Sequence, residues 1–227
     1  MDCFTLENLT FSYESAAENA LDGVTLSFRE GSFTVICGES GSGKSTLLRC
    51  LKTSLLPKGS VSGKVLFRGV PVSQTDARTQ AAKIGFVSQS PEAQTVTDTV
   101  GRELAFGLEC VGVSPDTIRR RVASTATFFG LNEIFYRRTS ELSGGQKQLL
   151  ALAAVTALSP EVIILDEPTS QLDPLAAFSF TEMLARLNRE TGVTVIIAEQ
   201  RLENVLPFAT DVAVLDRGRV VCSAPPA

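Results

Sequence analysis

The feature that most constrains the fold is a glycine-rich loop between an apolar run and a helical pattern. Residues 33–37 form a short apolar stretch, and residues 44–55 carry apolar side chains at helical spacing. The loop between them, Gly-Glu-Ser-Gly-Ser-Gly-Lys-Ser-Thr, fits the pattern G-x-x-x-x-G-K-[ST]. Its glycines let successive backbone N–H groups turn toward phosphate oxygens, and a helix N-terminus adds positive potential. The predicted nucleotide-binding residues are Gly38, Ser40, Gly41, Ser42, Gly43, Lys44, Ser45 and Thr46.

A second pattern supplies the acids that a metal–nucleotide site needs. The apolar run at residues 163–165 ends in Asp166 and Glu167. In an open α/β sheet, ligands bind at the carboxyl ends of the strands. Lys44 is predicted to contact the β- and γ-phosphates, while the Ser45 hydroxyl and Asp166 hold Mg²⁺, Asp166 through water. Glu167 is predicted to polarise the attacking water, so the two motifs together indicate an Mg-nucleotide site.

The composition excludes several other kinds of site. The chain has 227 residues, a formal net charge of −4 and no histidine. The acidic balance, with a pI near 5.1, disfavours electrostatic binding of nucleic acid. The absence of histidine removes histidine metal sites, histidine bases and Ser-His-Asp triads.

Cysteine usage and hydropathy indicate a cytosolic protein. The five cysteines are scattered with no C-x-x-C pair, which is typical of a reducing compartment, and all are expected to be small buried side chains. The N-terminus lacks the pattern of a signal peptide, and no apolar run reaches the roughly 20 residues of a membrane span. The cysteines are Cys3, Cys37, Cys50, Cys110 and Cys222.

Alternation of buried strands and helices predicts an α/β fold built on a mostly parallel sheet. We expect a single domain over residues 1–227, with its core in residues 1–90 and 160–227 and a helical subdomain at about 91–159. An antiparallel β part is expected within residues 1–70. Strands are expected at 3–11, 22–29, 33–37, 61–67, 84–87, 162–165, 193–198, 212–215 and 219–222, and helices at 44–55, 100–108, 116–129, 144–158, 174–190 and 201–208.

A Leu-Ser-Gly-Gly-Gln segment precedes the helix at 144–158 and forms a second candidate anion site. Ser143 is a natural N-cap, and the glycines expose N–H groups at a helix N-terminus. By position the segment resembles the signature motif of ATP-binding cassette (ABC) ATPases. Gln89 matches the Q-loop glutamine of that family, and Ser170 and Asp173 match its D-loop, with Gln171 where alanine is more usual. Tyr13 stands where an aromatic side chain stacks on adenine.

This resemblance covers essentially the whole chain and implies a RecA-like P-loop NTPase core. ABC ATPases work as head-to-tail pairs, with ATP and Mg²⁺ bound between one subunit's phosphate loop and the other's signature motif. The resemblance therefore implies catalytic roles for Glu167, Gln89 and Gln200 and a metal contact from Gln89 beside Ser45 and Asp166. The residues implied to contact the partner's ATP are Leu142, Ser143, Gly144, Gly145 and Gln146.

A narrower resemblance is to the energy-coupling-factor (ECF) branch, which powers uptake of vitamins and of cobalt or nickel ions. It is carried by Gln-Ser-Pro-Glu-Ala-Gln at 89–94, Thr-Asp-Thr-Val at 97–100, Glu-Leu-Ala-Phe-Gly-Leu-Glu at 103–109 and Glu-Gln-Arg-Leu-Glu at 199–203. It implies a second ABC ATPase as partner, in a homodimer or heterodimer. A transmembrane coupling subunit and a membrane substrate-binding subunit complete the implied assembly. The implied location is cytoplasmic, peripheral on the inner face of the cell membrane.

Two departures from the family pattern qualify this interpretation. Gln200 occupies the position of the switch histidine, and because glutamine cannot carry a proton near neutral pH, the hypothesis is that this chain's own site hydrolyses ATP slowly. The sequence also stops at Ser-Ala-Pro-Pro-Ala, where members of the branch usually continue. It is either part of a longer tandem polypeptide or a short member.

Two other functions stay open at this point. One is a soluble ABC ATPase of a machine without a membrane partner, which the acidic pI and the lack of a basic or coiled-coil insertion disfavour. The other is a scaffold that dimerises on ATP without useful turnover, which Gln200 favours and Glu167 opposes.

Overall fold

The computed structural model describes residues 1–14 and 18–226. Within them lie a six-stranded sheet of order β10-β9-β3-β8-β7-β6 and a four-stranded sheet of order β2-β1-β4-β5. The strands are β1 Asp2–Tyr13, β2 Leu21–Arg29, β3 Phe33–Cys37, β4 Gly59–Phe67, β5 Val70–Pro71, β6 Ile84–Val87, β7 Val162–Asp166, β8 Thr194–Ala198, β9 Asp211–Asp216 and β10 Arg219–Ala224. The α-helices are α1 Lys44–Cys50, α2 Ala77–Lys83, α3 Pro91–Gln94, α4 Val100–Cys110, α5 Pro115–Phe128, α6 Gly144–Ala157 and α7 Pro174–Thr191.

The six-stranded sheet forms the centre of the molecule. Strands β3, β7 and β8 are buried at every residue, as expected for parallel strands covered on both faces. β3 pairs in parallel with β8 and β9, and β7 pairs in parallel with β6 and β8. β10 alone pairs antiparallel, with β9, as the closing hairpin. The carboxyl ends of β3, β7 and β8 therefore lie side by side at one edge of the sheet.

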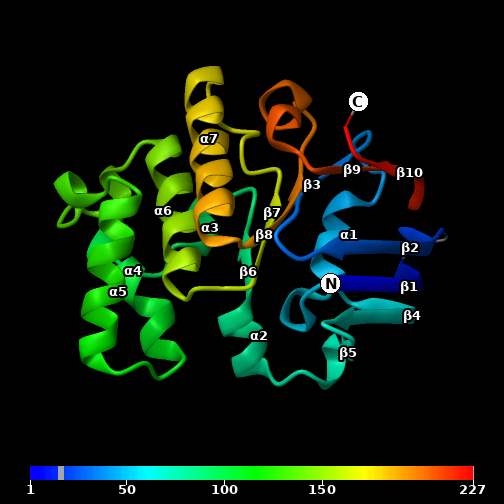
Figure 1. Ribbon diagram of the computed structural model, residues 1–227, viewed down its shortest axis with the longest axis horizontal. Coiled ribbons are helices and arrows are strands. Elements are labelled where there is room, and N and C mark those ends of the chain that lie inside the picture. Colours follow the sequence, from blue (N-terminus) through cyan, green and yellow to red (C-terminus); the bar gives the residue numbers. More distant parts are fainter. Residues whose placement is uncertain (15–17, 227) are drawn as a thin grey trace.

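The antiparallel sheet and the helices α4 and α5 lie at opposite ends of the molecule (Figure 1). β2 alternates buried and exposed side chains, so one face of the antiparallel sheet is buried. The apolar side chains of that face form a hydrophobic cluster with those of α1. Helices α4, α5 and α6 pack together at the other end. Their apolar side chains join a second cluster with α7 and the parallel strands. The predicted α/β class, with a mostly parallel sheet and an antiparallel β part, is confirmed.

Several local predictions were wrong. The helix predicted at 44–55 ends at Cys50 because Lys52 is extended (φ −139°) and its Nζ donates to the Ile84 carbonyl oxygen at 2.6 Å. The segment 201–208 forms two 3₁₀ turns, Leu202–Asn204 and Leu206–Phe208, with Pro207 interrupting any longer helix.

The cysteine prediction holds for three of the five residues. Cys3, Cys37 and Cys50 are buried, whereas Cys110 and Cys222 are exposed. Cys110 ends helix α4 and Cys222 lies on the edge strand β10, where neither side chain can reach a core. Helix α2 was not predicted, although Asp76 caps it by accepting from the Thr79 N–H at 2.9 Å. Among the described residues, no helix combines the length and apolar character that crossing a bilayer requires.

Candidate functional site

The phosphate loop has a backbone that only glycine can adopt at key positions. It follows β3 directly, and Gly38 has φ of 150° and Gly43 φ of 104°. A Cβ at Gly38 would lie 2.1 Å from the Leu215 carbonyl oxygen, and one at Gly43 would lie 2.6 Å from the Ala20 carbonyl oxygen. Both distances are far below van der Waals contact. The loop thus wraps tightly against β9 and the start of β2, and α1 begins at Lys44 without a side-chain cap.

Lys44 lies under the loop with its charged end held by backbone. Its Nζ donates to the carbonyl oxygens of Gly38 and Glu39, both at 2.9 Å, and lies 3.6 Å from Glu167 Oε1. The side chain is only 4% exposed, so its ammonium group is shielded from bulk water. A shielded positive charge below a glycine loop is suited to binding phosphate oxygens.

Ser45 and Asp166 bring a hydroxyl and a carboxylate together across the sheet. Ser45 Oγ donates to Asp166 Oδ1 at 2.7 Å. Burial raises the pKa of Asp166, against the opposing effects of the Ser45 hydrogen bond and the Arg49 guanidinium 3.9 Å away. Oxygen ligands of this kind suit Mg²⁺. The Ser42 hydroxyl is buried with no hydrogen-bond partner among the described residues, so the loop retains an unused polar atom.

Glu167 and Gln200 face each other across the carboxyl ends of β7 and β8. Gln200 Nε2 donates to Glu167 Oε1 at 2.7 Å. Glu167 has a positive φ of 45°, a strained conformation for a residue other than glycine. Strained backbone of this kind concentrates at functional sites, and here the Glu167 carboxylate lies 3.6 Å from Lys44 Nζ.

One cleft brings most of the predicted residues together. It has a volume of about 500 Å³ and contains parts of the phosphate loop together with Gln89 from the segment after β6. Tyr13 also lines it, edge-on to Phe11, and its hydroxyl lies 2.9 Å from Thr46 Oγ1. The lining residues are Tyr13, Ala20, Ser40, Gly41, Gly43, Lys44, Ser45, Thr46, Gln89, Glu167 and Gln200.

The Leu142–Gln146 segment does not line this cleft. Ser143 is the N-cap of α6, and its Oγ accepts from the Gln146 N–H at 3.3 Å. The Gln146 side chain in turn accepts from the Ser143 N–H at 3.0 Å, completing a capping box. Gly144 has open space where a Cβ would lie, and Gly145 has only the Ala176 side chain near that position, at 3.4 Å.

The predicted D-loop residues have structural partners. Ser170 Oγ donates to the Glu167 carbonyl oxygen at 2.9 Å and accepts from Gln89 Nε2 at 3.3 Å. Asp173 caps α7 by accepting from the N–H groups of Leu175 and Ala176, both at 3.0 Å. Ser170 thus connects the Q-loop glutamine to the backbone of Glu167.

Two residues beside the site, Glu199 and Thr169, were not predicted from the sequence. Glu199 is 1% exposed, and its Oε1 accepts from the N–H and the hydroxyl of Thr169 at 3.1 and 2.7 Å. Burial raises the pKa of the Glu199 carboxyl. An acid directly after the apolar run 193–198 repeats the pattern of Asp166 after its own apolar run, and that repeat was the available signal.

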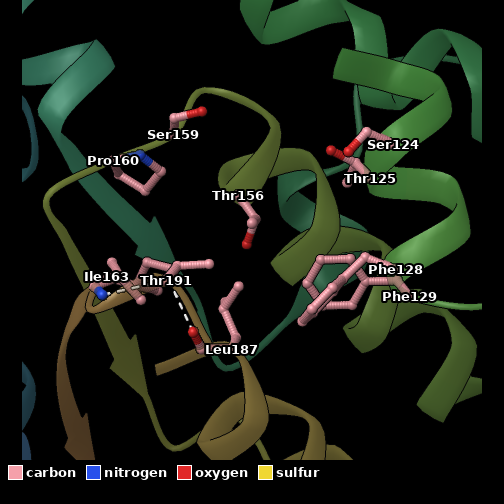
Figure 2. A pocket seen from close by; sticks show the side chains of 11 residues that line it. Ser124, Thr125, Phe128, Phe129, Thr156, Ser159, Pro160, Ile163, Leu187 and Thr191 are labelled. Carbon is pink, nitrogen blue, oxygen red and sulfur yellow. Dashed lines mark hydrogen bonds between the residues drawn. The ribbon is translucent and has the colours of Figure 1, made fainter. Parts of the chain in front are cut away.

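A second cavity, of about 370 Å³, lies away from this chemistry. Figure 2 shows Phe128 at the end of α5 and Phe129 directly after it, together with Thr156 of α6 and Leu187 of α7, around this cavity. Its lining contains hydroxyl and apolar side chains and no ionisable group. The cavity lies between α5, α6 and α7, and none of the predicted site residues lines it.

Comparison with known proteins decides the family. The family model described as ABC transporter matches residues 21–170, which include the phosphate loop, the signature segment and the two acids. The chain belongs to the ABC transporter family. This ABC cassette is 43% identical over 221 residues to an ABC transporter ATP-binding protein of Bacillus cereus and 39% identical over 224 residues to one of Methanosarcina acetivorans.

These alignments cover 97% of the present chain but 40% and 36% of the two relatives, so the chain spans about two-fifths of their length. Among solved structures, cbiO1 from Clostridium perfringens, part of the ABC transporter complex cbiONQ, is 32% identical with a TM-score of 0.89. That alignment covers 99% of this chain and 89% of the other. The dimeric cassette MJ0796 bound to ADP and Pi is 28% identical with a TM-score of 0.84, and 99% of each chain is covered.

Proposed function

We propose that this cassette binds Mg-ATP in the cleft and hydrolyses it to power an ECF-type membrane importer of a vitamin or a transition-metal ion. The observation that carries the proposal is the convergence of Lys44, the Ser45–Asp166 pair and Glu167 in one place. These groups supply, in order, a phosphate clamp, a metal-binding oxygen pair and a general base.

Each residue has a definite task in that reaction. The loop N–H groups and Lys44 bind the phosphate oxygens and orient the γ-phosphorus toward Glu167. A Glu167 carboxylate oxygen takes a proton from the attacking water as the water oxygen bonds to the γ-phosphorus and the bond from that phosphorus to the ADP oxygen breaks. Ser45, Asp166 and Gln89 would hold Mg²⁺, directly or through water. The ion would offset the negative charge of the phosphates.

The Gln200 contact supports the hypothesis of slow hydrolysis. Its amide occupies one lone pair of Glu167 Oε1 at 2.7 Å, the oxygen that also lies 3.6 Å from Lys44 Nζ. A histidine could accept and release a proton at this position, whereas the amide cannot. The same contact favours a second candidate function, a nucleotide-dependent scaffold that closes on ATP without useful turnover.

The proposed assembly is a head-to-tail pair of cassettes beneath a membrane coupling subunit and a substrate-binding subunit. Support comes from the likeness to cbiO1, whose structure is described as part of a transporter complex, and from the dimeric form of MJ0796. In such a pair, residues 142–146 would contact the partner's ATP. This assembly would lie at the cytoplasmic face of the membrane. Nucleic acid would not be among its partners.

Purification of the native complex tests this proposal directly. We expect membrane subunits to co-purify with the chain, and we expect the assembled complex to consume ATP steadily. Recovery without any membrane subunit would favour a soluble ABC machine. A complete complex that binds ATP but does not consume it would favour the scaffold.

A further inference from the structure

Glu199 is a buried carboxylate with no role in the chemistry proposed above. It directly follows β8, is 1% exposed, and does not line the nucleotide cleft. Removing a carboxylate from water is costly unless hydrogen bonds replace its hydration. Here the replacement comes from Thr169, which is fully buried and donates both its N–H and its hydroxyl to Glu199 Oε1.

This pair joins the two segments that carry Glu167 and Gln200. Thr169 lies two residues after Glu167, and Glu199 lies directly before Gln200. The same segments meet at two further points. The Glu167 N–H donates to the Ala198 carbonyl oxygen at 3.0 Å, and the Gln200 amide donates to the Glu167 side chain. Of these side-chain contacts, the Thr169–Glu199 pair is the one shielded from solvent.

The strained backbone of Glu167 needs such support. A positive φ at a residue with a Cβ costs conformational energy and persists only where surrounding contacts impose it. The chain after Glu167 could relax if Thr169 were free to move. Thr169 is hydrogen-bonded to Glu199, which follows β8, and the Glu167 N–H is hydrogen-bonded to the Ala198 carbonyl oxygen. The backbone from 167 to 169 is therefore held at both ends.

We propose that Glu199 and Thr169 form a positioning clamp, which holds Glu167 in its strained conformation and so directs its carboxylate into the nucleotide cleft. This inference rests on the proposed ATP hydrolysis. Neither residue lines the cleft, so both act through Glu167 and neither is a catalytic residue. Loss of the clamp should therefore slow the chemical step and leave nucleotide binding largely intact.

The chain offers a matched control for the test. Thr181 in α7 is also fully buried, and its hydroxyl donates to the Ala177 carbonyl oxygen at 3.0 Å. Thr169→Val and Thr181→Val therefore remove the same buried hydroxyl at nearly constant shape. Only the first alters a contact to the catalytic segments. If the two variants are equally stable but differ in kcat or in exchange rates, the difference reports the positioning of Glu167.

We expect Thr169→Val to lower kcat about tenfold with KM within about twofold, as the loss of one hydrogen bond to a charged acceptor implies. Thr181→Val should keep the parent kcat. Glu199→Gln, which keeps an acceptor oxygen, should retain more activity than Glu199→Ala. The double variant Thr169→Val/Glu199→Ala should be no slower than Glu199→Ala alone, because both changes remove one interaction.

Hydrogen exchange supplies a readout that does not need activity. In the parent chain and its variants, the amides of Glu167, Thr169 and Ser170 should exchange about tenfold faster in Thr169→Val than in Thr181→Val, as expected when one supporting hydrogen bond is lost. A complete complex without ATP turnover would refute the proposed hydrolysis, while the exchange rates would still test the clamp. Equal exchange in the two valine variants, or additive losses of kcat in the double variant, would overturn the clamp.

Discussion

The phosphate loop before α1 and the Leu142–Gln146 segment before α6 both contain glycines, but the two helix N-termini are organised differently. Before α1, the loop has no side-chain cap, and Lys44 is held by loop carbonyl groups within the cleft. Before α6, Ser143 and Gln146 cap each other, and the segment lies outside the cleft. The first end is therefore open toward a ligand of this chain. At the second end, Ser143 and Gln146 satisfy each other, and Ser143 and Gly144 are exposed at the surface.

The largest expected effect is a loss of ATP affinity on substitution of Lys44, at the phosphate loop before α1. Lys44→Ala should lower ATP affinity about 10³-fold, because two charge-assisted hydrogen bonds to phosphate, each worth about 1.5–3 kcal/mol, are lost. Titration with a fluorescent ATP analogue measures this. Lys64→Ala, at a lysine that is 68% exposed, is the control and should bind as the parent does. Unchanged affinity in Lys44→Ala would end the assignment of the loop as the phosphate site.

Glu167→Gln should separate chemistry from binding within the same cleft. We expect the hydrolysis rate to fall about 10²-fold, as is typical for loss of a general base, with ATP affinity retained. The ATP-bound dimer should then accumulate, and size-exclusion chromatography with light scattering detects it. Glu182→Gln, at an exposed position of α7, should hydrolyse ATP normally. If Glu167→Gln turned over at the parent rate, Glu167 would not be the base.

Gln200→His tests whether glutamine at the switch position slows ATP hydrolysis in the cleft. We expect a single-turnover rate about tenfold higher, somewhat below the roughly 10²–10³-fold worth of a complete transition-state donor, because glutamine supplies part of that interaction. Quench-flow measurement compares it with the parent and with Gln74→His, an exposed control. Equal rates in all three proteins would remove the argument for slow hydrolysis.

The smallest effect on hydrolysis should come from substitution of Ser143, the N-cap of α6. Ser143→Asp keeps an N-cap acceptor but places a negative charge where the partner's γ-phosphate would lie. Repulsion of about 1 kcal/mol implies about fivefold slower hydrolysis in the paired cassettes, with ATP affinity of the isolated chain unchanged. The matched control is Ser114→Asp at the start of α5.

Urea unfolding completes that comparison. Because aspartate caps helices as well as serine does, both aspartate variants should unfold within about 0.5 kcal/mol of the parent. Slower hydrolysis in Ser143→Asp without loss of stability assigns the segment to a partner's nucleotide. Equal hydrolysis in Ser143→Asp and Ser114→Asp would confine Ser143 to its structural role.

Features that depend on short stretches of sequence were predictable. The phosphate loop, the buried strands and the Ser143 cap are each encoded by neighbouring residues, because glycine turns, apolar runs and caps act locally. The wrong predictions were also instructive. The helix predicted over 44–55 ends at Cys50, where Lys52 is extended and its side chain contacts Ile84 on β6, a contact that no local pattern reveals.

The sequence by itself determined which chemical groups the proposed nucleotide site contains and in which order along the chain they occur. Only the tertiary structure decided which of them meet. Ser45 bonds to Asp166 across 121 positions and Gln200 to Glu167 across 33, because β3, β8 and β7 are neighbours with parallel carboxyl ends. The clamp between Thr169 and Glu199 has the same origin, since strand order follows from packing of the whole core.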